Sequence, residues 1–261
     1  MPRSLAALTC LAAVTLVATS LAATGRREPR LLEVDHLMLH VSPGAPERAA
    51  LARAGFTVSP DLNEHEGQGS ASVMVELANG FLELAWRDTS VRVEPRLEPV
   101  ARRYERMSAW RSSGWSPLGI GLRRAPGAPD SLPFPTRSVT APWMAPGDAI
   151  EIVSAFDDTL GPRLWVVPRS MAATGKPESE SERRRLARPE LLVHANGAHA
   201  ITAVRVLVPE GSRSAGPELI AARSEVVFTR GAGWLLEVTF DGGRRGIARD
   251  LRPELPLLCH F

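Results

Sequence analysis

Apolar and polar positions alternate along much of the chain, and this pattern predicts a protein built mainly from short strands. The run LLEVDHLMLHV at residues 31–41 follows a two-residue period, so successive side chains should point to opposite faces of a strand. One face would carry Val34, His36, Met38 and His40, and the other Asp35, Leu37, Leu39 and Val41.

The pattern that follows predicts a β-α-β-β-β order for the first part of the chain. A short helix is expected over residues 46–54, and a strand begins with FTVSP at 56–60. Two apolar runs, 71–77 and 81–86, read as strands, and Ala78-Asn79-Gly80 between them is typical of a hairpin turn.

The later elements are expected to be a helix on the outside of the sheet and several more strands. The helix covers residues 94–112, where apolar residues recur at helical spacing. Further strands are expected at 115–123, 137–144, 149–156, 163–169, 225–230 and 234–240, with another after the turn that begins at His194. The strands at 225–230 and 234–240 should pair as a hairpin through Gly231-Ala232-Gly233. Residues 172–193 are charged and low in apolar content, which predicts a linker or loop.

The N-terminus predicts export. Residues 1–23 carry an early cation, Arg3, and then an uncharged apolar run, which is typical of a secretory signal peptide. An uncleaved membrane anchor is the alternative, because about 20 apolar residues can span a bilayer. Residues 24–32 would be a linker. We therefore expect a periplasmic or secreted protein, or one attached to a membrane through this segment alone.

Composition and cysteine content narrow the function classes. The 261 residues are 44% hydrophobic and 23% charged, with a net charge of +2. No basic motif interleaved with aromatic residues is present, so nucleic acid is not an expected partner. Of the two cysteines, Cys10 lies in the leader, so a mature chain would hold only Cys259 and no internal disulfide. No nucleophile elbow, phosphate loop or dinucleotide fingerprint occurs.

Glu83 is the most unusual residue of the apolar strands. It stands between Leu82 and Leu84 and should point to the face opposite those leucines. A carboxylate at such a place is costly to bury unless a partner compensates it. The partner would be a metal, a substrate group or an arginine in a structural salt bridge.

These residues together resemble a known family. VDHLMLHV, a helix, AGFTVSP, HEGQG and GFLELAW follow one another, and HANGA precedes a later strand. This series resembles the glyoxalase-like branch of the vicinal oxygen chelate superfamily, which also contains bleomycin resistance proteins and extradiol dioxygenases. The resemblance implies an α+β fold in which βαβββ modules form a curled mixed sheet with a central cleft. Residues 33–171 would form this domain, and 194–261 an additional β-rich segment packed on it.

The resemblance also implies a metal site. The superfamily takes metal ligands from the first and last strands of each module, and those positions match His36 and Glu83. Imidazole and carboxylate suit Mn, Fe, Ni or Zn, which would act as a Lewis acid. If the second module spans 115–168, its first strand offers no ligand and Trp165 replaces a carboxylate. If it spans 198–240, Glu237 matches as a third ligand.

Several other residues are candidates for substrate contacts. His65 lies in a glycine-containing loop and would either act as an acid or base over the cleft or be a turn residue. His40, His194 and Asn196 are further candidates, although HANG is also typical of a turn. Trp86, Trp115, Trp143 and Trp165 would line a ligand cleft. His36 and Glu237 could instead be a buried histidine and a rim-exposed glutamate.

Three functions therefore remain open from the sequence. The first is a metal-assisted lyase, isomerase or dioxygenase that acts on a small vicinal-dioxygen substrate, with His65 and Glu83 as catalytic groups. The second is a non-catalytic protein of the same fold that binds or sequesters a small molecule. The third is a structural cell-envelope protein. The family resemblance leaves both a monomer and a homodimer open.

Overall fold

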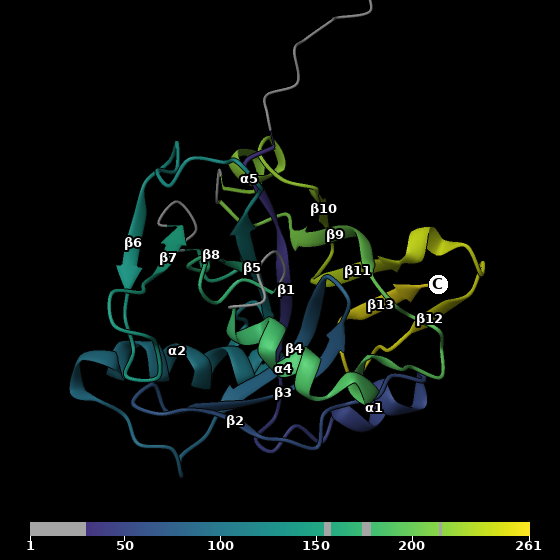
Figure 1. The fold of residues 1–261 in the computed structure, drawn as a ribbon, viewed down its shortest axis with the longest axis horizontal. Coiled ribbons are helices and arrows are strands. Elements are labelled where there is room, and N and C mark those ends of the chain that lie inside the picture. The colour runs from purple at the N-terminus through teal and green to yellow at the C-terminus, as the bar shows by residue number, and fades with distance from the viewer. Residues whose placement is uncertain (1–29, 154–157, 174–178, 214–215) are drawn as a thin grey trace, which may run out of the picture.

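The computed structural model describes residues 30–153, 158–173, 179–213 and 216–261, which fold into an α+β protein with two sheets (Figure 1). The predicted signal peptide and most of the linker after it lie outside these residues. The larger sheet has eight strands and curls into a half-barrel, in the order β2-β3-β4-β1-β5-β8-β7-β6. Its strands are β1 (Leu32–His40), β2 (Asn63–His65), β3 (Ser70–Leu77), β4 (Gly80–Arg87), β5 (Leu118–Arg124), β6 (Thr136–Val139), β7 (Ile150–Val153) and β8 (Arg163–Val166).

The larger sheet consists of two halves with the same strand order. β1 pairs with β4 in parallel, β5 pairs with β8 in parallel, and β1 and β5 meet as antiparallel neighbours at the centre. Each half then continues outward through two antiparallel pairings. The partner of the first module is therefore the segment that holds β5 to β8. The alternative partner in residues 198–240 belongs to the other sheet.

Helices cover parts of both sheets and connect their strands. The longest is α2 on β4, where its buried Tyr104 and Met107 pack inward. The helices are α1 (Arg48–Arg53), η1 (Pro95–Leu97), α2 (Glu98–Ser108), α3 (Trp110–Ser113), α4 (Glu180–Ala187), η3 (Pro189–Leu192), α5 (Gly216–Ala221) and η4 (Asp241–Gly243).

β1 departs from the strict two-residue period at a bulge. Val34 pairs with Leu122 and His36 with Gly121, so Asp35 is an extra residue on this strand. As a result Val34 packs into the same core as Leu37, contrary to the simple alternation. Asp35 in turn lines the same cavity as His36. The bulge thus moves a second polar side chain to the concave face.

The smaller sheet has five strands in the order β10-β9-β11-β13-β12. Its strands are β9 (Ile201–Pro209), β10 (Val226–Gly231), β11 (Leu235–Phe240), β12 (Ala248–Asp250) and β13 (Leu257–His260). The predicted hairpin between β10 and β11 is wrong, because both strands pair with β9, one on each side. β10 runs parallel to β9, which requires a crossover, and α5 lies in that connection.

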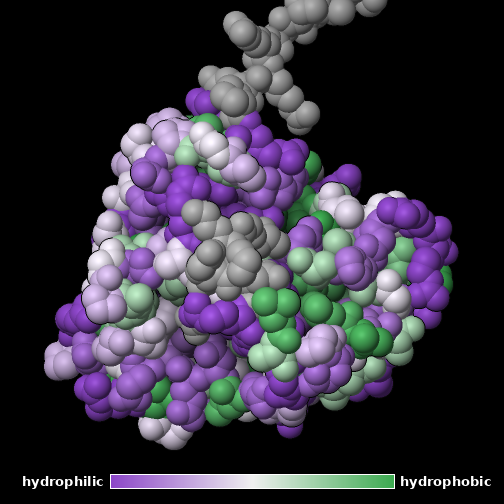
Figure 2. All heavy atoms as spheres, in the orientation of Figure 1, coloured by the Kyte–Doolittle hydropathy of each residue, from purple (hydrophilic) through white to green (hydrophobic). Residues whose placement is uncertain are grey.

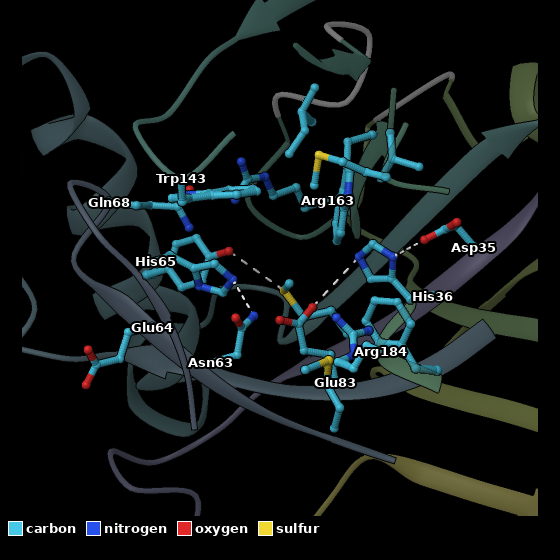
Figure 3. A pocket seen from close by; sticks show the side chains of 18 residues that line it. Asp35, His36, Asn63, Glu64, His65, Gln68, Glu83, Trp143, Arg163 and Arg184 are labelled. Carbon is cyan, nitrogen blue, oxygen red and sulfur yellow. Dashed lines mark hydrogen bonds and ion pairs between the residues drawn. The ribbon is translucent and has the colours of Figure 1, made fainter. Parts of the chain in front are cut away.

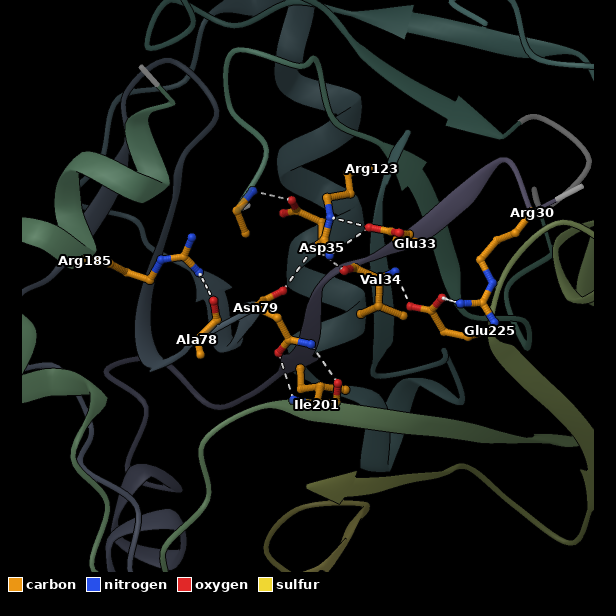
Figure 4. A network of polar contacts seen from close by, with 11 residues as sticks. Arg30, Glu33, Val34, Asp35, Ala78, Asn79, Arg123, Arg185, Ile201 and Glu225 are labelled. Atoms are coloured by element: carbon orange, nitrogen blue, oxygen red, sulfur yellow. Dashed lines mark hydrogen bonds and ion pairs between the residues drawn. The ribbon is translucent and has the colours of Figure 1, made fainter. Parts of the chain in front are cut away.

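The two sheets share one hydrophobic core. Leu37, Leu82 and Ile120 of the half-barrel belong to the same buried cluster as Val206 and Phe240 of the smaller sheet. A polar junction adds to this contact (Figure 4): Asn79 Nδ2 donates to the Ile201 carbonyl at 2.7 Å, and its Oδ1 accepts from the Ile201 amide at 2.8 Å. The segment 194–261 therefore packs on the half-barrel through both apolar and polar contacts.

The predicted charged loop at 172–193 contains two helices, α4 and η3. Arg184 of α4 forms an ion pair with Glu76 at 2.6 Å, and Arg185 donates to the Leu77 carbonyl at 3.0 Å. Some charged side chains of this segment therefore bind the helix to β3, and the segment is not only a solvated loop. Figure 2 shows apolar side chains gathered around α4, where Leu186 and Val193 are exposed. Within the described ranges no helix is long and apolar enough to cross a bilayer.

Candidate functional site

The concave face of the half-barrel holds a cavity of about 300 Å³ (Figure 3). Side chains from both halves of the sheet, from the loop after β2 and from α4 contribute to its walls. Prominent among them are His36, Phe81, Glu83, Trp143, Arg163 and Trp165. The cavity therefore lies where the two modules meet.

Asp35 orients the ring of His36. Its Oδ1 lies 2.6 Å from His36 Nδ1, and its Oδ2 accepts from the Ala173 amide at 2.6 Å. An ionised carboxylate accepts here, so Nδ1 carries a proton, and Nε2 faces Glu83. The His36 ring also stacks on Phe81, with centroids 4.4 Å apart. These contacts hold the imidazole in one orientation.

Two glycines of β5 make room for the aromatic rings of this site. A Cβ on Gly121 would lie 2.3 Å from His36 Cε1. A Cβ on Gly119 would lie 2.9 Å from the ring of Trp165. Any side chain at either position would therefore push against a ring that lines the cavity.

Glu83 lines the cavity and is almost completely buried. Its Oε2 lies 3.8 Å from His36 Nε2, and its side chain is directed away from Leu82 and Leu84, which pack in the core. It forms no ion pair with an arginine of the described chain. The expected structural salt bridge is therefore not present among these residues, and the carboxylate faces the cavity with His36.

The sheet register shows what stands opposite His36 and Glu83 in the second module. β1 pairs Leu37 with Ile120, and a twofold axis through that pair exchanges His36 with Gly119. The same axis exchanges Glu83 with Trp165, because Glu83 neighbours Met38 and Trp165 neighbours Gly121. In the second module, Gly119 therefore stands at the position of His36, and the indole of Trp165 stands at the position of Glu83.

These residues do not supply the ligand set that the resemblance to the vicinal oxygen chelate superfamily implies. Catalytic zinc sites take three protein ligands, whereas His36 and Glu83 supply two. Gly119 offers no donor, and an indole is not a metal ligand. Among the described residues, no group of three or more histidine, cysteine, aspartate or glutamate side chains is arranged to hold a metal ion.

His65 lines the opposite side of the cavity with both ring nitrogens in hydrogen bonds. Nε2 lies 3.0 Å from Asn63 Nδ2, and Nδ1 lies 3.1 Å from Ser70 Oγ. Because the amide nitrogen of Asn63 donates, Nε2 accepts and Nδ1 carries the proton. The ring also packs against Trp143 at 5.3 Å. His65 therefore forms part of the cavity wall, and both of its ring nitrogens are engaged in these hydrogen bonds.

His40 shares the strand with His36 but lies outside the cavity. It is fully buried against Tyr104, with ring centroids 4.8 Å apart, and neither ring nitrogen has a hydrogen-bond partner. Burial, together with the charges of Arg163 and Arg103, lowers the pKa of His40 to about 3. The ring is therefore neutral and has no access to a ligand in the cavity.

His194, Asn196 and Glu237 are not brought to the cavity. His194 Nδ1 accepts from the Thr57 amide and Nε2 donates to the Glu76 carbonyl, so this ring joins two segments of the fold. Asn196 bonds to the Ala54 carbonyl beside a separate surface cleft. Glu237 is on β11 of the smaller sheet, 3.6 Å from Arg205.

Of the four tryptophans expected to line a ligand cleft, two line the cavity and two lie elsewhere. Trp143 and Trp165 line the cavity, as expected. Trp86 packs in the shared core and donates to Asp88 at 3.2 Å. Trp115 lies beneath the guanidinium groups of Arg103 and Arg106.

Sequence reasoning missed several charged residues that line the cavity, among them Asp35, Arg163 and Arg184. Asp35 was assigned to the core face, and only the bulge brings it to His36. Arg163 begins β8 and Arg184 lies in the segment read as a loop. An arginine directly before an apolar strand, as in RLWVV, is the one local signal that could have indicated Arg163.

No family model matches the sequence, and no curated protein matches it. Among solved structures, a protein described as a hypothetical protein from Staphylococcus aureus has a similar structure. The similarity covers 88% of this chain and 99% of that protein's chain. The two share 10% sequence identity, with a TM-score of 0.46. At this level of similarity the comparison assigns neither a family nor an activity to the chain.

Proposed function

We propose that this protein has a glyoxalase-like fold and binds a small organic molecule in the cavity on the concave face of its larger sheet. The observation that carries the proposal is the convergence of His36 Nε2 and Glu83 on a cavity of about 300 Å³ with aromatic walls. Small-molecule sites combine apolar, aromatic surfaces with a few convergent polar groups in this way. The apolar run at residues 1–23 supports export as part of the same proposal.

Binding is better supported than metal-assisted catalysis. A metal-assisted lyase, isomerase or dioxygenase would need donors where the second module has Gly119 and Trp165. Trp165 instead presents its ring 5.2 Å from that of His36, as a surface for an apolar or aromatic group. The position that the family resemblance reserves for a ligand therefore favours a hydrophobic contact.

Proton transfer without a metal is a second candidate, favoured by the Asp35–His36 pair. A histidine that donates Nδ1–H to a carboxylate presents Nε2 as a base, and the resulting imidazolium is stabilised by that carboxylate. His36 has this arrangement, at 2.6 Å. A bound molecule with an acidic C–H or O–H group near Nε2 could therefore lose a proton to His36.

A fragment screen tests the binding proposal. The full chain is screened by ligand-observed NMR against small aromatic and aliphatic fragments. Ile150 lines the cavity, so Ile150→Trp should fill it and abolish binding. Val193→Trp changes a residue that is 71% exposed and outside the cavity, and should leave binding unchanged. An empty screen, or fragments that bind the Ile150→Trp protein equally well, would contradict the proposal.

Solvent exchange tests the second candidate. Fragments that bind and carry a carbon-bound hydrogen beside a carbonyl are incubated with the protein in D₂O. Deuterium incorporation that stops in His36→Gln and slows in Asp35→Asn is the expected result. If the fragments bind but exchange at the same rate without protein, the cavity binds them and does not catalyse proton transfer.

A further inference from the structure

Buried nitrogen donors without partners gather around the cavity. In the described part of the chain, the buried side-chain nitrogens that lack a hydrogen-bond partner belong to Trp143, Arg163, Arg184 and His40. The first three of these residues line the cavity. A buried donor without an acceptor costs free energy comparable to its lost hydration. The walls of the cavity therefore include three residues that each hold a buried donor without a partner.

Among the residues that the structure describes, no carboxylate forms an ion pair with the cation of Arg163. Its Nε is buried without a hydrogen-bond partner. Arg184, in contrast, is ion-paired with Glu76 at 2.6 Å. The Arg163 guanidinium packs over the rings of Tyr104 and Trp165, at 5.7 and 5.6 Å. These contacts favour the cation but leave its Nε–H without an acceptor.

Other cations lie near Arg163, and their repulsion would be reduced by a bound anion. Burial and the neighbouring cations Arg103 and Arg137 lower its pKa, and the hydrogen bond to Tyr104 opposes that shift. An arginine remains protonated at neutral pH despite such a shift. A planar guanidinium recognises carboxylates through paired hydrogen bonds, so an incoming carboxylate would relieve the repulsion among these cations.

Trp165 lies between the two polar ends of the cavity. Its ring is 5.6 Å from the Arg163 guanidinium and 5.2 Å from the His36 ring. Figure 3 shows Trp143 and Arg163 on one side of the cavity and His36 with Glu83 on another. A single small molecule packed on Trp165 would therefore reach Arg163 at one end and the acceptors His36 Nε2 and Glu83 at the other.

We propose that Arg163 is the anion-binding end of the cavity, and that the ligand is a small organic carboxylate with a hydroxyl group directed toward His36 and Glu83. This inference rests on the proposed function and specifies its ligand class. The apolar part of the ligand would lie on Trp165 and Phe81, which line the cavity between the polar groups.

A matched pair of probes tests this ligand class. Mandelate carries a phenyl ring, a hydroxyl and a carboxylate, and 1-phenylethane-1,2-diol replaces the carboxylate by a neutral alcohol. The dissociation constants of both are measured by calorimetry with the full chain. Mandelate should bind about 10- to 100-fold more tightly, as expected for a charge-assisted pair of hydrogen bonds.

The variants locate that preference. Arg163→Gln should remove it while the diol binds as before, and Arg163→Lys, which keeps the charge but not the paired donors, should lose most of it. The control is Arg169→Gln, which removes a cation that pairs with Asp130 outside the cavity and should leave the preference intact.

The outcomes separate this inference from the proposed function. Equal binding of the two probes, or a preference that survives Arg163→Gln and Arg163→Lys, would overturn the anion site. Binding of the diol that is lost in Ile150→Trp would still support the cavity as a ligand site. If neither probe binds the unchanged protein, the anion site is overturned, whereas the proposed function is still decided by the fragment screen and its Ile150→Trp control.

Discussion

Among the described residues, the Glu83 carboxylate on the cavity wall has no arginine partner, and His36 lies 3.8 Å away. Removing its charge should therefore not break a buried ion pair with an arginine. We expect Glu83→Gln, which keeps the shape of the side chain, to leave the free energy of unfolding within about 1 kcal/mol of the original value.

Urea unfolding of the Glu83→Gln protein, with the unchanged chain as reference, measures this difference. A loss of about 3–5 kcal/mol would contradict the expectation, because that is the typical cost of breaking a buried ion pair by removing one partner. A small change combined with altered ligand binding would support Glu83 as a group that acts on the ligand.

His40 makes stability depend on pH. Its pKa is about 3 in the folded protein against an ordinary value of 6.5, because burial and two arginines disfavour the cation. Below pH 6.5 the unfolded chain binds a proton that the folded protein refuses, so stability is complete above pH 6.5 and falls toward pH 3. Each such histidine contributes a slope of about 1.4 kcal/mol per pH unit. Burial also lowers the pKa of His194, with the same sign.

Substitution of His40 by leucine should flatten this dependence. The measurement is the free energy of unfolding between pH 7 and pH 4 for His40→Leu, for the unchanged chain and for His199→Gln, an exposed histidine used as control. The leucine variant should lose less stability on acidification than the other two. Three parallel pH profiles would show that His40 is not held neutral by the fold.

At the scale of elements, the central pair of strands β1 and β5 builds the site. The sequence pattern located β1, and the family resemblance paired His36 with Glu83; both residues line the cavity. It could not predict the bulge at Asp35, because alternation alone contains no signal for an inserted residue. It also could not predict that α4 docks through Arg184 and Arg185, since a charge run has the same composition whether it is solvated or paired.

The glycines of β5 are the sharpest test of this local geometry. Gly121→Ala places a methyl group where the His36 ring now lies, at 2.3 Å from Cε1. We expect it to destabilise the fold by about 1–3 kcal/mol through overpacking and to abolish ligand binding, because His36 cannot keep both Asp35 and Phe81 as partners.

Gly233→Ala is the matched control for this change. No atom lies within 4 Å of a Cβ at Gly233, so this variant should bind ligand like the unchanged chain. Normal binding by the Gly121→Ala protein would mean that the position of His36 is not needed for the site.

At the scale of the whole molecule, the sequence indicated the half-barrel but not the second sheet. The α+β class and the curled mixed sheet agree with the structure, and of the two segments that could hold the second module, 115–168 lies in the larger sheet. The segment 194–261 was expected to be β-rich, yet its strand order depends on a parallel crossover through α5. Pairings between strands distant in sequence carry no local signal, and a glycine-bearing turn between β10 and β11 favoured the wrong hairpin.

The two sheets should unfold together in one cooperative transition, even when the polar junction between them is weakened. Asn79→Ala removes both hydrogen bonds to the Ile201 backbone, at 2.7 and 2.8 Å. We expect a loss of about 2–3 kcal/mol with a single cooperative transition, because the sheets still share one apolar core. Hydrogen exchange of amides in β3 and β9 measures this directly. Separate unfolding free energies for the two sheets would contradict a common core.

The most direct test of the account as a whole is a crystal structure of the full chain with the fragment that binds most tightly. The account predicts the fragment on the concave face, between His36, Glu83 and Arg163, with its ring against Trp165. A fragment found instead in the surface cleft beside Asn196 and Arg245, with the cavity on the concave face left empty, would contradict it.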